Sequence, residues 1–282
     1  MNSEEQQGWI INAGNKLQSY YQAAASAMLI KMYSDLPIAV CVDKTDNWPK
    51  EYEDVIDYIV EYPFGDTSHG QSDWVQLNQW QFFHISPFAK NIVIEADTLI
   101  LNNIDYIFSL LESNLVDVLF PIQVTDFRAK PYIPLHVLKF PENKINIAHA
   151  GIWLFNKEEN ASAYFKMLDI VCHNWRELFK EYFKPEHVPD TPEIDAIHSV
   201  TLKMLDEYES YTVSDPSLLR YAHLISKPDQ KWNDQMNTWY TNNFKVDNYR
   251  QNGIIKYTEP SVITGTIIDG IRTHYRNTLR TS

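Results

Sequence analysis

The sequence contains few glycines and few cysteines, and each shortage argues against a class of protein. Its 282 residues include only 8 glycines, and no G-x-G-x-x-G or Walker-type loop is present to cradle phosphates. We therefore expect neither a dinucleotide-binding dehydrogenase nor a P-loop NTPase. The 2 cysteines, Cys41 and Cys172, imply no disulfide framework, so a reducing compartment fits the chain.

Positive charge and long apolar runs are also scarce. Lys and Arg number 24 against 37 Asp and Glu, a net charge of −13, which argues against nucleic-acid binding because phosphate backbones select basic surfaces. No run approaches the roughly 20 apolar residues of a transmembrane helix. Residues 1–8 are too polar for a signal peptide. We expect a soluble, cytoplasmic protein without a transmembrane segment.

The apolar content suffices for a large core, and its pattern predicts an α/β fold. Hydrophobic residues make up 44% of the chain and aromatic residues 13%. Residues 8–12 and 38–42 are typical of buried strands, and residues 17–33 between them have strong helix propensity. This β-α-β unit is the signature of a parallel sheet. Further helices are expected at residues 51–60, 72–85, 104–114, 158–183 and 193–208, further strands at 91–94, 116–120 and 145–155, and a loop at 127–146.

Polar residues follow the first two predicted strands. The turn Ala13-Gly14-Asn15 comes directly after the first strand, and Asp43 comes directly after the second. The carboxyl ends of parallel strands meet at one edge of a sheet, and open α/β sheets bind ligands there. We expect a nucleotide to lie at this edge.

Two carboxylates end the third predicted strand. Residues 91–94 follow a Ser86-Pro87 turn and lead directly into Glu95 and Asp97. Residues i and i+2 of an extended chain point to the same side. Both carboxylates can therefore converge on one hard cation, Mn²⁺ or Mg²⁺, that also binds substrate phosphate. The alternative is a solvated strand end with two surface acids.

Three more residues are candidates with two interpretations each. Arg128 lies in a proline-containing loop and either clamps a diphosphate or is solvated. His149, beside Gly151 in an apolar run, is either a ligand-site residue or a hydrogen-bonded core histidine, since a strand glycine often marks close approach. Asp195 opens a predicted helix, where the helix dipole alone favours an acid; the alternative is a substrate-binding or catalytic carboxylate.

The last third of the chain adds two candidates and one amphipathic segment. The His223 imidazole can complete an oxygen-rich Mn²⁺ site, and Lys227 can meet phosphates. Residues 267–280 predict a basic amphipathic helix in an acidic protein. That helix packs on the body, contacts an anionic surface, or does neither.

Taken in order, these features resemble the GT-A class of nucleotide-sugar glycosyltransferases. The resemblance is closest to the glycogenin-like and lipopolysaccharide-galactosyltransferase-like group, with related bacterial and phage-encoded transferases. It covers roughly the first 230 residues and is strongest from Trp80 to Leu101, where Glu95-Ala96-Asp97 looks like the family's D-x-D motif. Residues 148–155 look like its N-x-G strand, residues 193–195 like the acidic position after that strand, and His223 with Lys227 like its late His…Lys-Pro segment.

The sequence departs from the family pattern in three places. Glu95 replaces the first Asp of the D-x-D motif, and His149 stands where Asn is usual. The segment after His223 is shortened and contains no Gly.

The resemblance implies an α/β fold of GT-A type, a Rossmann-like mixed, mainly parallel sheet flanked by helices. Residues 1–230 would form the nucleotide-sugar-binding catalytic domain, and residues 231–282 a helical elaboration packed on it. The implied activity is that of a metal-dependent, hexosyltransferase-like enzyme moving a sugar from a UDP-sugar to a saccharide, lipid or protein acceptor.

The resemblance also implies roles for the candidate residues. Glu95, Asp97 and His223 would hold Mn²⁺ or Mg²⁺, which would neutralise the leaving UDP. The nucleoside would be bounded by Ala13, Gly14, Asn15 and Asp43, with Arg128 and Lys227 adding charge at the phosphates. Asp195 and His149 would lie on the acceptor side, Asp195 as the base if the reaction inverts; a retaining reaction needs no such base.

Two alternatives share this fold. A sugar nucleotidyltransferase needs a glycine-rich, basic loop after the first strand, and residues 12–15 lack that character. The aromatic content would suit a non-catalytic carbohydrate- or nucleotide-binding protein. This alternative stays open because a fold alone does not establish function.

Overall fold

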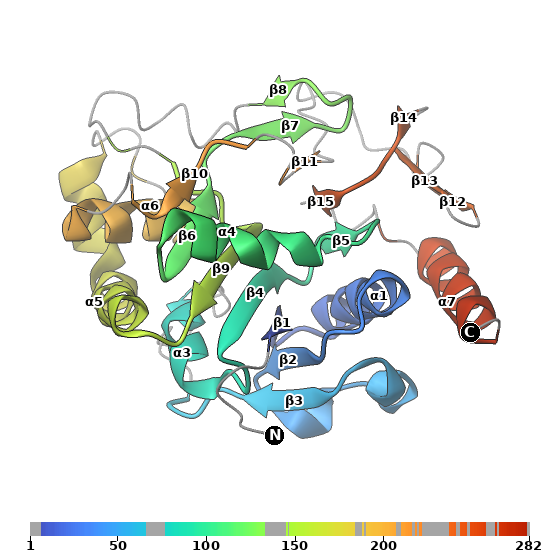
Figure 1. Cartoon of the computed structure of the whole chain (residues 1–282). Helices are drawn as coiled ribbons and strands as arrows, with labels where there is room; N and C mark the ends of the chain where they lie inside the picture. Colours follow the sequence, from blue (N-terminus) through green and yellow to red (C-terminus); the bar gives the residue numbers. More distant parts are fainter. Residues whose placement is uncertain are drawn as a thin grey trace.

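A computed structural model shows a central sheet with helices on both faces (Figure 1). The residues that it describes are 7–65, 77–132, 145, 147–183, 188, 190–206, 210–215, 218, 220–221, 237–240, 243–246, 249–257, 263 and 265–280. The seven strands of the sheet lie in the order β10-β6-β9-β4-β1-β2-β3. They are β1 (Gln7–Gly14), β2 (Ile38–Val42), β3 (Tyr58–Glu61), β4 (Lys90–Glu95), β6 (Val118–Pro121), β9 (Ile152–Asn156) and β10 (Thr212–Val213).

Every strand of this sheet runs parallel to the others except β9, which is antiparallel to β4 and β6. The inner strands are buried along most of their length, as expected for a sheet covered on both faces. Asn12 lies opposite Glu95, and Gly14 lies opposite Val42. The carboxyl ends of the first, second and fourth strands therefore meet at one edge, which confirms the mixed, mainly parallel sheet and its opening β-α-β unit.

Six α-helices of the described chain surround the sheet. On one face lie α1 (Leu17–Tyr33) and α4 (Phe108–Asn114), and on the other α3 (Phe82–Ile85), α5 (Glu159–Tyr182) and α6 (Ile194–Leu205), with α7 (Gly265–Leu279) outside α1 (Figure 1). Short 3₁₀ turns occur at η1 (Thr45–Asn47), η2 (Lys50–Val55), η3 (Gln79–Gln81) and η4 (Asp105–Ile107). In the part of the chain that the structure describes, no helix is both long and apolar enough to cross a membrane.

The face under α5 and α6 is packed with aromatic rings. The Trp153 ring stacks on Phe120, with ring centroids 5.2 Å apart, and also meets Tyr164, Phe165 and His198. All five side chains are buried. This cluster fixes β9 and α6 against each other.

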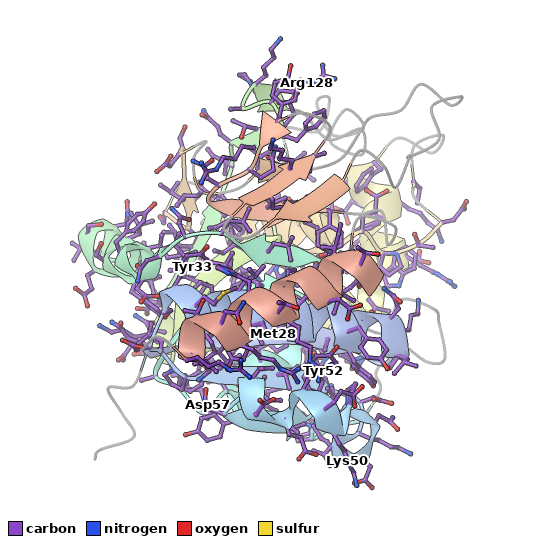
Figure 2. All side chains as sticks on the ribbon, turned by 90° about the vertical axis from the view of Figure 1, so that its right-hand side faces the viewer. Met28, Tyr33, Lys50, Tyr52, Asp57 and Arg128 are labelled. Carbon is purple, nitrogen blue, oxygen red and sulfur yellow. The ribbon has the colours of Figure 1, made fainter. Side chains whose placement is uncertain are left out.

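The opposite face is covered by α1, which is buried nearly all round. One side of α1 contacts β1, and α7 packs on another. Figure 2 views the molecule from this side, with α7 in front of the region labelled Met28 and Tyr52. The Arg272 guanidinium lies 5.0 Å from the centroid of the Tyr52 ring. The predicted basic amphipathic helix thus packs on the body of the protein.

A second sheet lies beside the carboxyl edge of the first. Its strand order is β5-β15-β11-β7-β8, with β5 (Thr98–Ile100), β15 (Ile254–Lys256), β11 (Arg220–Tyr221), β7 (Val124–Asp126) and β8 (Pro131–Tyr132). A small antiparallel sheet contains β12 (Asn237–Tyr240), β13 (Asn243–Val246) and β14 (Tyr249–Arg250). The C-terminal region therefore contributes strands as well as a helix. In the second sheet, the pairing of β15 with β5 sets Lys256 opposite Thr98.

The sequence-based prediction is wrong at three segments. Residues 51–60 form a 3₁₀ turn and the edge strand β3 instead of a helix, because Asp57 accepts the Ile38 N–H at 2.7 Å and starts strand pairing. The strand expected at 145–155 begins only at Ile152, and residues 147–151 before it form a loop. The loop expected at 127–146 contains β8. Residues 72–76, the start of the helix expected at 72–85, lie outside the described residues.

Candidate functional site

Glu95 ends β4, and Asp97 lies in the two-residue turn that leads into β5. Other elements hold this turn through its backbone. The N–H of the intervening alanine donates to the Asn12 carbonyl at 3.1 Å, and its carbonyl accepts the Ser26 hydroxyl at 3.2 Å. The Asp97 carbonyl accepts the Tyr257 N–H at 2.9 Å. Both carboxylates are therefore presented in a fixed position at the carboxyl edge of the sheet.

The amine of Lys256 lies between the two carboxylates. Its Nζ donates to Glu95 Oε2 and to Asp97 Oδ1, the latter at 2.8 Å. The side chains are 8% exposed for Lys256, 12% for Glu95 and 27% for Asp97. Buried charges of this kind are stable only when paired and hydrogen-bonded, and this cluster pairs one cation with two acids.

The charge state of the cluster follows from burial and pairing. Burial alone lowers the pKa of Lys256, but Asp97 and Glu95 outweigh it and hold that pKa above its ordinary value. Burial also raises the pKa of Glu95, with the Lys256 charge opposing and the Asp97 charge adding to the shift. The two shifts are compatible, since the Asp97 carboxylate alone suffices to pair a charged Lys256.

A hydrogen-bonded chain reaches Glu95 from the aromatic core. The Tyr164 hydroxyl bonds His198 Nδ1, His198 Nε2 lies 2.9 Å from Gln79 Oε1, and Gln79 Nε2 donates to Glu95 Oε1 at 3.4 Å. A neutral imidazole with its proton on Nε2 satisfies every bond in this chain. Burial lowers the pKa of His198 to about 3, with the Asp195 charge opposing, so the neutral form is the stable one.

The predicted nucleoside side lies along the ends of β1 and β2. Gly14 has φ +68°, a left-handed conformation that glycine adopts without strain, and its carbonyl accepts the Asp43 N–H at 3.1 Å. Ala13 is buried and Asn15 exposed. The Asp43 carboxylate accepts the Tyr20 hydroxyl and, at 3.0 Å, the amide of Asn47.

Asn12 holds a buried donor beside this turn. Its Oδ1 accepts the Tyr62 hydroxyl at 2.8 Å, whereas its Nδ2 has no partner among the described residues. An unpaired buried donor is costly. Asn12 lies opposite Glu95 in the sheet, so this donor is close to the end of β4.

The side chains of His149 and Asp195 contact each other. His149 Nδ1 lies 3.3 Å from Asp195 Oδ2, and the Ala150 N–H donates to Asp195 Oδ1 at 2.9 Å. Both side chains are buried. The Gly151 carbonyl accepts the Thr98 hydroxyl at 3.2 Å, so the close approach expected at this glycine is made by another part of the protein. Asp195, from the first turn of α6, thereby fixes the loop before β9.

The structure does not bring every candidate to this edge. Arg128 lies at the β7–β8 turn, where its guanidinium is 4.8 Å from the Phe127 ring centroid and 5.9 Å from that of Tyr249. Figure 2 places it at one extreme of the molecule, opposite Lys50. His223 and Lys227 lie outside the described residues, and their roles stay predictions.

Three residues of the site are absent from the sequence-based prediction: Lys256, Gln79 and His198. For Lys256 a signal exists, because it is a lone charge in the apolar run Ile254–Tyr257. A lysine in a buried strand needs acidic partners. Gln79 and His198 sit inside helical patterns that give no such signal.

The expected divalent cation fits this arrangement poorly. Glu95 and Asp97 offer the oxygen ligands that Mn²⁺ and Mg²⁺ prefer, but the Lys256 amine already binds both carboxylates. Within the described residues, no group of three or more His, Cys, Asp and Glu side chains is arranged to hold a metal ion. As placed, the cluster accommodates an ammonium group and not a second cation.

The fold is similar to that of several solved glycosyltransferases. The galactosyltransferase LgtC, in complex with donor and acceptor sugar analogues, matches with a TM-score of 0.53 at 12% identity, covering 97% of this chain and 95% of that one. Mouse xyloside xylosyltransferase 1, in apo form, matches with a TM-score of 0.53 at 12% identity, covering 92% and 99%. The apo structure of the bifunctional glycosyltransferase WbbM matches with a TM-score of 0.52 at 12% identity, covering 97% and 50%.

No family model matches the sequence, and no curated protein matches it. At 12% identity the structural similarity shows the fold alone. The expected GT-A glycosyltransferase fold is therefore confirmed by the architecture.

Proposed function

We propose that the protein is a glycosyltransferase that uses a nucleotide sugar, with a UDP-sugar as donor. The observation that carries the proposal is the Glu95–Asp97 turn, held rigidly at the carboxyl edge of a GT-A sheet. Ligands of open α/β sheets bind at that edge. The absence of a glycine-rich phosphate loop after β1 argues against the nucleotidyltransferase alternative.

The nucleoside lies along the turn formed by Ala13, Gly14 and Asn15, with Asp43 on its other side. Asn12 Nδ2, a buried donor without a partner among the described residues, lies on the residue two before Gly14. The acidic turn and Lys256 lie at the diphosphate. The Arg128 guanidinium packs against the Phe127 and Tyr249 rings, so Lys227 is the favoured phosphate clamp in this proposal.

The chemical demand of the reaction is the stabilisation of charge on the leaving diphosphate. Sugar transfer proceeds through an oxocarbenium-like state, and preorganised positive groups near the leaving oxygens lower its barrier. The family resemblance implies a divalent metal on Glu95, Asp97 and His223 as the source of that charge. The described residues offer the Lys256 ammonium instead.

Asp195 and His149 mark the acceptor side. Both lie at the edge that carries Glu95, and the Asp195 charge is close enough to contribute to the raised pKa of Glu95, after burial and the nearer charges. In an inverting reaction Asp195 acts as the base for the acceptor hydroxyl. In a retaining reaction its task is to hold His149 and the loop before β9.

A thermal-shift panel of nucleotides and nucleotide sugars tests the donor class. A ligand at 100 times its dissociation constant stabilises the native state by about 2.7 kcal/mol. We expect UDP and a UDP-sugar to raise the melting temperature, and the UDP-sugar to be slowly hydrolysed to UDP. Asp97→Asn should abolish hydrolysis, whereas Glu53→Gln, at an exposed acid of η2, should not.

Each of the other outcomes would favour one of the alternative functions. A shift only with a nucleoside triphosphate and a sugar phosphate would favour the nucleotidyltransferase. No shift with any nucleotide, and no hydrolysis, would leave a non-catalytic protein of the same fold.

A further inference from the structure

We propose that the ammonium group of Lys256 takes the position of the divalent cation at the donor diphosphate, so that donor binding by this protein needs no metal ion. This inference rests on the proposed function for the identity of the donor. It does not depend on that function for the arrangement of the three side chains.

Backbone pairing positions Lys256 on the acidic turn. Strand β15 runs antiparallel to β5 and sets Lys256 opposite Thr98, and the next N–H along the chain, that of Tyr257, bonds the Asp97 carbonyl at 2.9 Å. The register of β15 against β5 therefore fixes the backbone of Lys256 beside the acidic turn. A flexible surface lysine that happened to contact two acids would have no such backbone pairing.

The three side chains form a site with one open side. Lys256 and Glu95 are almost fully buried, whereas the Asp97 side chain keeps 27% of its surface exposed. An ammonium group has three N–H donors, and bonds to Glu95 and Asp97 account for two. A third donor remains for a phosphate oxygen that approaches from the side of Asp97.

Charge repulsion argues against a metal in addition to the lysine. An ion bound by Glu95 and Asp97 would stand next to the ammonium nitrogen, 2.8 Å from Asp97 Oδ1, in a buried place where like charges repel strongly. To bind, the ion must either displace Lys256 or share its ligands. Displacement would leave a buried ammonium without a partner, which is costly.

The exchange of a metal for a lysine changes the charge of the site. With both acids ionised, two carboxylates with one ammonium carry one more negative charge than the same pair with a divalent ion. In that state the diphosphate draws further positive charge from elsewhere. Glu95 and Asp97 then act as positioning residues for the amine, and Lys256 is the residue that contacts the donor.

The first test needs no variant. UDP affinity is measured by calorimetry in EDTA and again with Mn²⁺ or Mg²⁺. We expect the two dissociation constants to agree within about twofold. UDP binding that is about tenfold or more tighter with Mn²⁺ would overturn the proposal.

The second test works even if the protein binds no nucleotide, an outcome that would contradict the proposed function alone. Mn²⁺ binding to the free protein is followed by electron paramagnetic resonance. Wild type should bind no Mn²⁺ at Asp97, so Asp97→Asn should leave Mn²⁺ binding unchanged. Lys256→Met should gain a Mn²⁺ site, because the carboxylate pair is freed. A wild-type Mn²⁺ site lost in Asp97→Asn would contradict the lysine assignment.

Matched variants distinguish the effect of the Lys256 charge from a general effect on folding. Lys256→Met should weaken UDP binding in EDTA by about tenfold or more, the worth of one charge-assisted hydrogen bond, and Mn²⁺ should recover part of that loss. Lys203→Met, at an exposed lysine of α6, should change neither property. If Lys256→Met does not fold, Lys256→Arg keeps the charge and should remain insensitive to EDTA; dependence on Mn²⁺ in that variant would count against the proposal.

Discussion

Tyr164 and His198 are bonded and stacked in the core, with the tyrosine hydroxyl on His198 Nδ1 and the two rings inclined by only 6°. The other ring nitrogen lies 2.9 Å from Gln79 Oε1. A neutral imidazole with its proton on Nε2 has a partner for each nitrogen. Protonation would require the Tyr164 hydroxyl to turn and accept the Nδ1 proton, and it would place a charge in the buried core.

Stability should fall in acid because of His198. Burial lowers the pKa of its imidazole to about 3 in the folded state, while an unfolded histidine titrates near 6.5. Between these values the unfolded chain binds the extra proton, so stability is lost as pH falls, by up to about 1.4 kcal/mol per pH unit. Urea unfolding of wild type and His198→Gln at neutral pH and at about pH 5 checks this.

The control for this titration is His84→Gln, at an exposed histidine of α3. We expect the stability difference between wild type and His198→Gln to shrink as the pH falls. The same difference is measured for His84→Gln at both pH values. Equal pH dependence in all three proteins would exclude His198 as the cause.

Asp195 should stabilise the folded protein whether or not it takes part in catalysis. Asp195→Ala removes the acceptor of the Ala150 N–H and leaves a buried donor unpaired, at a cost of about 1–3 kcal/mol. Asp195→Asn keeps an acceptor oxygen and should cost less. Denaturant unfolding measures both, and an alanine variant as stable as wild type would refute this account.

Sugar transfer by the two Asp195 variants then shows whether Asp195 acts as the base or as a positioning residue. If the reaction inverts and Asp195 is the base, Asp195→Asn should lose transfer while staying folded. Transfer retained by Asp195→Asn would assign the residue to positioning the loop before β9.

Gly8 should tolerate no side chain. A Cβ at this position would lie 2.4 Å from the ring of Phe88, which is itself buried. Overpacking of this kind costs about 1–3 kcal/mol. A methyl group added at Gly265, in α7, would have nothing within 4 Å, so Gly265→Ala should be neutral or mildly stabilising. Thermal unfolding of Gly8→Ala and Gly265→Ala provides the comparison.

The two thiols should be inert in the native protein. Cys41 and Cys172 are 1% and 3% exposed, and burial raises the pKa of both thiols above the ordinary value. Since the thiolate is the reactive form, a thiol reagent should label neither cysteine before unfolding and both in denaturant. Rapid labelling of the folded protein would show that one of these regions opens readily.

Local patterns predict the elements that build the edge of the site. The helix expected at residues 17–33 has those bounds in the structure, because alanine-rich propensity and flanking turns act within one segment. The acidic pair is likewise recognisable from the strand that precedes it. The edge strand β3 is not predicted, because its pairing with β2 outweighs a weak helical pattern.

Long-range register explains what the sequence does not predict. Lys256 meets Asp97 only because β15 pairs with β5, and no local pattern specifies that partner. His149 and Asp195 are each candidates from their local sequence, but their contact depends on α6 folding onto the loop before β9. Such placements arise from the packing of the whole chain.

The contact between α1 and α7 has a consequence for biosynthesis. Helix α1 is buried nearly all round, and α7, from the other end of the described chain, covers part of it. A ribosome that has made α1 must still translate past residue 279 before that cover exists. Until then part of the apolar surface of α1 stays uncovered, and exposed apolar surface of this kind makes a partly folded chain prone to aggregation.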